Sequence, residues 1–445
     1  MSPFPYLVSY RLRVVLICVM FATLTWCGRH YRLDDALIYA RYVLHAYQSR
    51  GLYFNDGERV NALTSILDTW LQLGLTYVLH GRVLLAQAIL GGAFLFGALL
   101  MAEAVVPLAG VLLAAGSYFY FLTGMETPIF VFCLALTVWA YTAGKYNWLP
   151  LLCVLCCLAR LEGGALLLVI TLQLWRQRRF PPLVSFVPAL LLIAVYLLCN
   201  LHFYGSPLPQ SASAKIGQGM SGLWGRWPTA FLRFPSDMLL PLGGCWVFAV
   251  ILTILAWFGS RAPNMATRNQ LVIPFIVLLG SFYVLCNIPA YRWYYAPFIY
   301  FFYIYAARLI PAKKNFQVSV LIVTVCMALF SSWDLWHNGI EEEPYARAGD
   351  WLNEHTPPDA RIAAIETGTI GWHCDRYLID VVGLTTPANA RYTANGDISS
   401  WIKERPDYIV VHFDGRFRWE KVALASPDYE FLPVRFNSVG LLRRK

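Results

Sequence analysis

The chain has 445 residues, of which 58% are hydrophobic and 14% are charged. Soluble domains carry about 25% charged residues, so this composition excludes an ordinary soluble domain and indicates a polytopic membrane protein. The formal net charge of +9 fits basic loops that meet anionic headgroups, or a phosphate ligand. Nucleic acid is not an expected partner, because the basic residues are scattered between apolar runs. Most of the 11 cysteines lie inside those runs, which predicts neither a disulfide framework nor a metal site.

Apolar runs set the expected order of the spans. Runs long enough to cross a bilayer, or nearly so, lie at 12–28, 63–80, 83–102, 104–122, 127–143, 148–159, 163–175, 181–201, 239–259, 271–289, 293–310 and 316–333. Arg11 and Arg13 before the first run resemble the start of a signal peptide, but no small-residue cleavage site follows. The first run is therefore predicted to stay as an uncleaved span.

Basic loops predict which ends of the spans face the cytoplasm. The markers are Arg11 and Arg13, the loop 176–179, Arg261 with Arg268, and Lys313 with Lys314. On this assignment Asp34, Met125, the loop 202–238 and everything after about 334 lie outside. An even number of crossings must then separate Asp34 from Met125, yet three apolar runs lie between them. The run 63–80 contains Asp68 and Gln72, so we predict an interfacial helix there and about 11 crossings in all.

The composition changes at about residue 334, where charged residues, Gly and Pro become frequent. The segments 361–365 and 408–411 have the pattern of buried strands, and 343–355 predicts a helix. The expected fold is therefore an α-helical polytopic membrane domain over 1–333, followed by an extracytoplasmic α/β domain over 334–445. The membrane domain includes a first external loop at 28–62.

Two adjacent acids, Asp34 and Asp35, follow the first predicted span, where a helix could run to about Arg50. At 100° per residue, Asp34, Arg41 and His45 share one face of that helix, while Asp35 points elsewhere. A carboxylate at the membrane surface can act as a base toward a lipid-borne substrate. Asp is also favoured at helix starts, so a structural role for the pair is an equal alternative.

Polar residues at the other predicted external corners could join this site. They are Glu58 in the first loop, Glu126 at a helix start, Arg160 and Glu162 between two short runs, Tyr204 and Lys215 in the loop 202–238, and Arg292 among aromatic residues. An ionisable pair at membrane depth points by default to function. The structural alternatives stay open: a cap for Glu126, a mutual ion pair for Arg160 and Glu162, and an interfacial aromatic belt around Arg292.

Short fragments with a shared resemblance recur in order from about residue 30 to 390. They are Asp34-Asp35-Ala36 with Ile38 and Arg41-Tyr42; Phe54-Asn55 with Gly57-Glu58-Arg59-Val60 and Thr64-Ser65; Gly124-Met125-Glu126-Thr127; Ala159-Arg160 with Glu162-Gly163; Tyr204-Gly205 with Pro207-Leu208-Pro209 and Lys215; and Gly368, Ile370-Gly371, Asp380 and Gly383-Leu384. Together they resemble membrane glycosyltransferases of the GT-C class that use lipid-phosphate sugars. The resemblance is strongest to arabinofuranosyltransferases of the mycobacterial cell-wall arabinosyltransferase B type and to the pilin arabinosyltransferase.

The resemblance implies transfer of D-arabinofuranose from a polyprenyl-phosphate donor, such as decaprenylphosphoryl arabinose, to an extracytoplasmic glycan or pilin. Asp34 or Asp35, with a preference for Asp34, would be the base in an inverting displacement. The donor phosphate would be held by Arg160, Lys215, Arg292 and Arg41, and substrate would be bound by Glu126, Glu162, His45, Glu58 and Tyr204. Neither a metal nor another cofactor is required. The expected location is the bacterial inner membrane, with the site facing the periplasm.

Two departures and several alternatives bear on this expectation. Leu161 and the pair Gln210-Ser211 stand where family members tend to have Pro and Asn-Thr, and the second change bears on donor or acceptor identity. The same chemistry could use mannose or aminoarabinose. A lipid-linked sugar flippase or transporter would usually show paired repeats and ionisable residues near the midplane, whereas the ionisable residues here gather at one face. An oligosaccharide ligase that uses a lipid diphosphate is disfavoured by the few cations at the outer corners.

Overall fold

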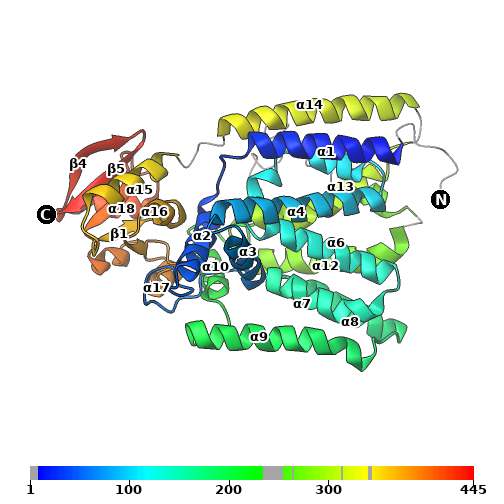
Figure 1. Ribbon diagram of the computed structural model, residues 1–445, viewed down its shortest axis with the longest axis horizontal. Helices are drawn as coiled ribbons and strands as arrows, with labels where there is room; N and C mark the ends of the chain where they lie inside the picture. Colours follow the sequence, from blue (N-terminus) through cyan, green and yellow to red (C-terminus); the bar gives the residue numbers. More distant parts are fainter. Residues whose placement is uncertain (1–8, 234–253, 263–264, 312–313, 339–342) are drawn as a thin grey trace.

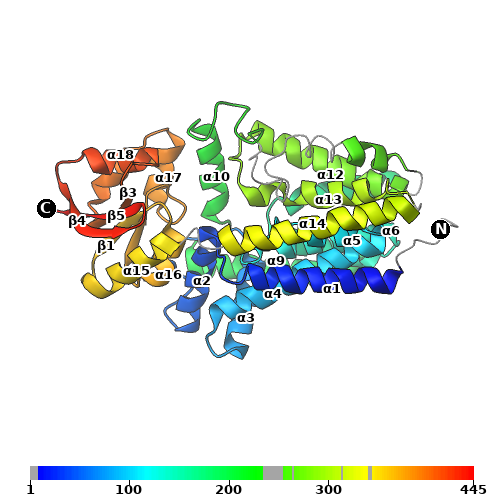
Figure 2. The same cartoon turned by 90° about the horizontal axis from the view of Figure 1, so that it is seen from above.

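The computed structural model describes residues 9–233, 254–262, 265–311, 314–338 and 343–445. Long helices lie side by side in a bundle, and an outer domain with a β-sheet sits at one end of it (Figure 1). Helices that run across the bundle direction lie between these two parts (Figure 2). Both predicted parts of the fold are therefore present.

Five helical stretches in the described residues are long and apolar enough to cross a membrane, so the chain is a multi-pass membrane protein. They are α1 (Tyr10–Cys27), α4 (Val83–Val105), Leu183–Tyr204 with α9 (Val187–Tyr204), α12 (Ala266–Leu285), and Asn315–His337 within α14 (Lys314–Asn338). Shorter bundle helices are α6 (Thr127–Thr142), α7 (Leu149–Ala159), α8 (Gly163–Gln177) and α13 (Ala296–Ala307). The predicted count of about 11 crossings is not confirmed. The predicted run 239–259 falls mostly outside the described residues.

The prediction of one span over 104–122 is wrong as a continuous helix. The α-helix there, α5 (Ala109–Ala115), has only 7 residues, and it ends where Gly116 adopts extended dihedrals. A single 3-10 turn, η1 (Tyr120–Leu122), follows. Hydropathy identified an apolar run correctly but could not show that its backbone is broken.

This broken segment nevertheless returns along α4. Near the C-terminal end of α4, a Cβ added to Gly110 would lie 2.4 Å from the carbonyl oxygen of Leu99. Nearer its N-terminal end, a Cβ added to Gly91 would lie 1.8 Å from the carbonyl oxygen of Thr123. The segment therefore runs antiparallel to α4 and brings residue 124 back to α2. Asp34 and Met125 thus lie at the same end of the bundle, as an even number of crossings between them requires.

The crosswise helices are α2 (Asp34–Tyr47), α3 (Ile66–Val78) and α10 (Gln210–Met220). Figure 2 shows α3 and α10 at a steep angle to α1 and α4. With 13 residues, α3 is too short to cross a bilayer, which needs about 20. These helices build the layer between the bundle and the outer domain.

The outer domain is an α/β unit, as predicted. Its five-stranded sheet has the order β2-β1-β3-β5-β4. Strands β2, β1 and β3 pair in parallel, and β5 pairs antiparallel with both β3 and β4. The strands are β1 (Arg361–Ala364), β2 (Tyr377–Asp380), β3 (Tyr408–His412), β4 (Tyr429–Phe436) and β5 (Val439–Arg444). The helices are α15 (Glu343–His355), α16 (Thr367–His373), α17 (Pro387–Ala394) and α18 (Arg418–Ala425). The predicted helix at 343–355 and the two predicted strands are confirmed.

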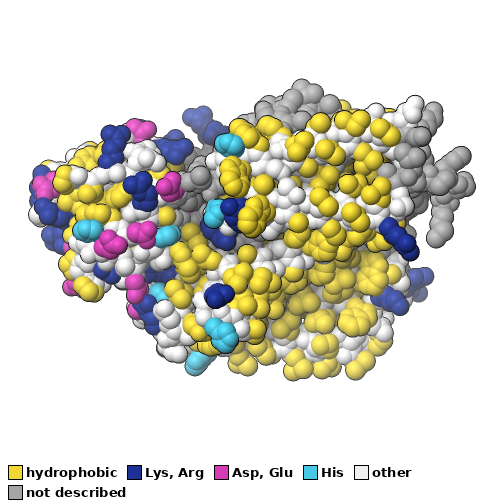
Figure 3. Space-filling view, turned by 45° about the horizontal axis from the view of Figure 1, so that its top comes forward, with side chains coloured by type: hydrophobic (Ala, Val, Ile, Leu, Met, Phe, Trp, Pro, Cys, Tyr) yellow, Lys and Arg dark blue, Asp and Glu magenta, His cyan; other side chains and the backbone are white. Residues whose placement is uncertain are grey.

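The surface separates the two parts by chemistry. Hydrophobic side chains cover the visible side of the bundle, whereas charged side chains gather on the outer domain and at the bundle ends (Figure 3). A surface of this kind fits lipid around the bundle and water around the outer domain. The crosswise helices therefore lie at the boundary between lipid and water.

Candidate active site

Asp34 begins α2 and faces the outer domain. Its carboxylate accepts a hydrogen bond of 2.6 Å from the backbone N–H of Thr369, in the first turn of α16. The contact is close, because a Cβ added to Gly368 would lie 1.9 Å from the carbonyl oxygen of Asp34. Burial raises the pKa of Asp34 to about 7, against the lowering effect of the Thr369 N–H. The carboxylate thus acts as the cap of a helix 335 residues away in sequence.

Arg41 lies on the same side of α2 and is 2% exposed. Its guanidinium donates hydrogen bonds of 2.5–2.9 Å to four backbone carbonyls, those of Phe54, Gly371, Cys374 and Arg376. Three of these carbonyls belong to the outer domain. Arg41 was predicted to bind donor phosphate, but in the structure its guanidinium donors hold the outer domain against α2.

Three predicted substrate-binding residues, His45, Glu58 and Tyr204, do not line the cavity described below. His45 is buried with Nδ1 3.0 Å from the carbonyl oxygen of Tyr53. Burial, followed by the charges of two nearby arginines, lowers its pKa to about 4. Glu58 accepts hydrogen bonds from Asn55 and Tyr377, and Tyr204 is buried in the core cluster beneath the domain. His45 and Glu58 thus fix the first loop, and Tyr204 belongs to the buried core.

Asp35 points in a different direction from its neighbour. Its Oδ2 atom lies 4.0 Å from Nζ of Lys215 on α10, and its side chain is 24% exposed. The ammonium of Lys215 also stands 4.4 Å from the ring centroid of Tyr291 and 5.6 Å from that of Trp293, which stack on each other. An acid and a cation are thus held together over an aromatic platform, and both remain partly accessible.

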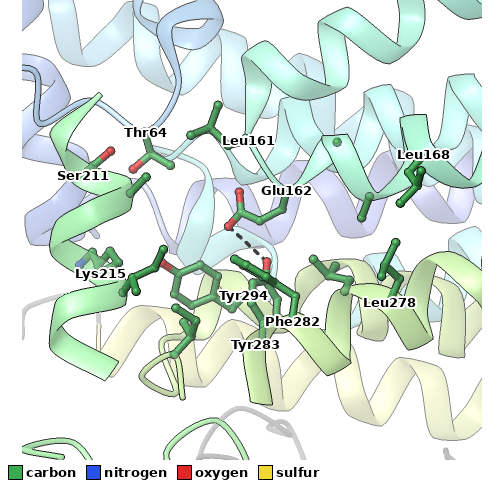
Figure 4. Close-up of a pocket in the computed structure, with 16 residues that line it drawn as sticks. Thr64, Leu161, Glu162, Leu168, Ser211, Lys215, Leu278, Phe282, Tyr283 and Tyr294 are labelled. Carbon is green, nitrogen blue, oxygen red and sulfur yellow. Dashed lines mark hydrogen bonds between the residues drawn. The ribbon is translucent and has the colours of Figure 1, made fainter. Parts of the chain in front are cut away.

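Lys215 lines a cavity of about 400 Å³ between α8, α10 and α12. Polar groups gather at one end, where Thr64, Ser211 and Glu162 join Lys215, and Figure 4 shows this arrangement. Leu168 and Leu278 stand at the other end (Figure 4), and Leu279, Phe282 and Ala165 add further apolar lining. A cavity with one polar end and a long apolar side at the lipid boundary fits an amphiphile with a polar head.

Arg160 stands behind the polar end of this cavity. It is 1% exposed and forms ion pairs with Glu126 and, at 2.8 Å, with Glu162. Tyr283 donates a hydrogen bond of 3.2 Å to Glu162, drawn as the dashed line in Figure 4. The structure thus brings three predicted site residues together. Arg160 binds the two acids directly, and Glu162 is the member of the cluster that reaches the cavity.

Arg292 lies at the start of the turn η6 (Arg292–Tyr295), with its guanidinium 5.6 Å from the ring centroid of Phe121. It does not line the cavity at Lys215, although its neighbour Tyr294 does. Sequence reasoning missed Tyr283, which stands in an apolar run without any polar signal. It used Asp68 only to predict an interfacial helix and gave it no place in the site, although burial and then the charge of Glu126 raise the pKa of Asp68 to about 8. The position of Asp68 inside an apolar run was the sequence signal that could have identified it as a candidate functional residue.

Comparisons with known proteins place the fold. A family model described as "Domain of unknown function (DUF8728)" matches residues 335–439, and a search of curated proteins found no match. Among solved structures, ArnT from Cupriavidus metallidurans bound to undecaprenyl phosphate aligns with a TM-score of 0.58 at 14% identity. That alignment covers 96% of this chain and 97% of ArnT. Arabinofuranosyltransferase AftD from mycobacteria aligns with a TM-score of 0.45 at 15% identity, over 98% of this chain and 40% of AftD. The resemblance to the GT-C class is confirmed as a likeness of fold, carried by ArnT.

Proposed function

We propose that the chain transfers a sugar from a polyprenyl-phosphate donor to an acceptor at the outer face of the membrane. The observation that carries this proposal is the cavity at Lys215, whose apolar side lies along bundle helices. Lys215 at its polar end lies 4.0 Å from Asp35. A prenyl chain fits the apolar side, and its phosphate fits the ammonium. The solved ArnT of similar fold is bound to undecaprenyl phosphate, which supports this class of donor.

Asp35 is the proposed base, in place of Asp34. The carboxylate of Asp34 already accepts a backbone N–H of α16, whereas the carboxylate of Asp35 faces Lys215, which lines the cavity. In the proposed step Asp35 takes the proton of an acceptor hydroxyl, and the oxygen attacks the anomeric carbon. The bond from that carbon to the phosphate oxygen breaks, and polyprenyl phosphate leaves with inversion at carbon.

The leaving phosphate gains one negative charge when the bond to carbon breaks. A fixed cation at that position stabilises the transition state more than the ground state. Lys215 is the cation that lines the polar end of the cavity. Glu162, which contacts Arg160 and Tyr283, would accept hydrogen bonds from sugar hydroxyls.

The sugar and the acceptor follow from the sequence resemblance alone. On that basis D-arabinofuranose is the proposed sugar, and an extracytoplasmic glycan or pilin is the proposed acceptor. The outer domain, adjacent to α2 and α10, would present that acceptor. The proposed location is the bacterial inner membrane, with this end of the bundle toward the periplasm.

The full chain in lipid nanodiscs, supplied with radiolabelled polyprenyl-phosphate arabinofuranose and a glycan acceptor, tests the proposal. Release of polyprenyl phosphate together with a labelled acceptor is the expected result. A parallel series with mannose and aminoarabinose donors assigns the sugar. Binding of every donor without release from any of them would contradict transfer and favour the flippase alternative.

Donor binding is tested with Lys215→Gln. A hydrogen bond to a charged group contributes about 1.5–3 kcal/mol, so polyprenyl phosphate should bind roughly 10- to 100-fold more weakly. The matched control is Lys145→Gln, which removes the same charge from an exposed position between α6 and α7. Equal affinity in both variants would remove Lys215 from the donor site.

A further inference from the structure

A second cavity lies between the bundle and the outer domain, on a different set of residues from the cavity at Lys215. It has a volume of about 620 Å³ and is formed where the segment after α1 meets the C-terminal end of α14, α15 and α16. The two cavities share no lining residue. Nothing in the proposed sugar transfer uses this second space.

Two guanidinium groups line it. Arg29 donates one hydrogen bond of 2.9 Å to the carbonyl oxygen of Trp26, and its guanidinium lies 4.2 Å from the ring centroid of Trp26 and 5.2 Å from that of Trp336. Arg32 donates one of 2.6 Å to the carbonyl oxygen of Tyr31. Its Nε atom is buried and has no hydrogen-bond partner within the described part of the chain. A buried, charged donor without a partner is costly, so an acceptor is expected to complete the site.

The charge of the lining favours an anion. His30 stands beside the two arginines, and among the described residues of the lining Glu343 is the one carboxylate. His373, also in the lining, pairs with Asp350 at 2.9 Å. Arginine presents several N–H donors in one plane and binds phosphate oxygens well. A phosphate is therefore the chemical group that the lining fits.

The position of the cavity favours a lipid as the source of that phosphate. Trp26 is 65% exposed and Trp336 is 52% exposed, at the ends of two apolar helices that lead out of the membrane. Exposed tryptophans in such places mark the headgroup level of a bilayer. Leu37, Leu84 and Leu335 add an apolar wall that a dissolved phosphate would not need. Basic and histidine side chains are visible at this junction in Figure 3.

We propose that this cavity binds the headgroup of an anionic phospholipid, with Arg29 and Arg32 as the phosphate ligands. The bound lipid would fill the space between α14 and α16 and so connect the bundle to the outer domain. The proposal stands on this cavity alone and does not depend on the sugar transfer proposed above.

Native mass spectrometry of the full chain in detergent, titrated with phosphatidylglycerol or phosphatidylcholine, is the test. Phosphatidylglycerol should bind about tenfold more tightly than phosphatidylcholine, as expected for charge-assisted hydrogen bonds. The double variant Arg29→Gln with Arg32→Gln should lose this preference, while polyprenyl phosphate binding stays unchanged. Arg29→Lys with Arg32→Lys should retain most of it, which guards against a loss caused by misfolding.

The matched control is Arg416→Gln with Arg418→Gln, two exposed positions on the outer domain that remove the same charge. It should behave like the unsubstituted chain. The proposal is overturned if phosphatidylglycerol is not preferred, if the glutamine variant still prefers it, or if the control loses as much. Glycerol phosphate, the headgroup without tails, should compete only weakly; binding as tight as that of the lipid would overturn the lipid source.

Discussion

The two sides of α2 use the same kinds of side chain for different purposes. On the side toward the outer domain, Asp34 and Arg41 are buried and meet backbone groups of α16 and the segment after it. On the side toward α10, Asp35 is partly exposed, and its described ionic partner, Lys215, lines the cavity. Asp34 and Asp35 carry the same side chain and lie equally close to the membrane. Their different roles therefore depend on the groups that each one contacts. A carboxylate already used as a cap fixes structure, whereas a partly exposed one next to a cavity-lining lysine is available for proton transfer.

The largest effect is expected on the cavity side. Asp35→Asn should lower the rate of sugar transfer by roughly 10²–10⁴-fold, the range of general-base catalysis, while polyprenyl phosphate still binds. Asp34→Asn is the matched control, because its amide oxygen can still accept the N–H of Thr369. It should cost less than about tenfold in rate. A deeper loss for Asp34→Asn than for Asp35→Asn would reverse the comparison and restore Asp34 as the base.

An intermediate effect is expected where the domain packs on α2. Gly368→Ala would place a Cβ 1.9 Å from the carbonyl oxygen of Asp34, so the α16 contact must shift. Overpacking of this kind costs about 1–3 kcal/mol of stability. Thermal unfolding in detergent and hydrogen exchange at α16 should both report the loss.

The matched control for this substitution is Gly74→Ala in α3. A Cβ there meets nothing within 4 Å, and alanine suits a helix interior better than glycine by about 0.5–1 kcal/mol. Gly74→Ala should leave stability unchanged or raise it. Equal behaviour of the two variants would show that the contact between α16 and α2 contributes little.

The smallest effect concerns pH. Burial raises the pKa of Asp34 from 3.8 to about 7, so the folded chain holds this proton over a range in which the unfolded chain has lost it. The contribution of this proton to the free energy of unfolding is fully present below about pH 3.8 and is lost as the pH rises to about 7. Asp34→Asn cannot ionise, so its unfolding temperature should fall less between pH 5 and pH 8, by on the order of a few degrees. The exposed Asp414→Asn should keep the original slope, and an identical slope in all three proteins would rule out this titration.

Local pattern predicted much of this arrangement. The helical spacing placed Asp34, Arg41 and His45 on one face of α2, and all three are buried on that face. The predicted helix at 343–355 and the strands near 361 and 408 follow from periodicity in the same way. Such elements are visible because each depends only on residues close in sequence.

What that face of α2 touches could not be predicted, because the contacts of Arg41 are made with carbonyls up to 335 residues away. Helical spacing does not distinguish a carboxylate that already accepts a hydrogen bond from one that is available. For the same reason the sequence predicts Arg41 at the phosphate, an ion pair of Arg160 with Glu162 is only one of its alternatives, and its structural alternative for Glu126 is a helix cap. Long-range partners decide the role of a polar residue, and they become visible only in the folded chain.

The broken segment that follows α4 has a consequence for how the protein is made. Its 7-residue helix and irregular continuation leave backbone groups that lipid cannot satisfy, so this stretch is stable only when other helices surround it. Some of those helices come from the other end of the chain: α13 and α14 both pack on α5, and Ser117 donates a hydrogen bond of 2.9 Å to Asp334. During synthesis the N-terminal half must therefore wait, incompletely packed, until the last spans leave the ribosome. A chain that stops before α14 would present this segment to the quality-control proteases of the membrane.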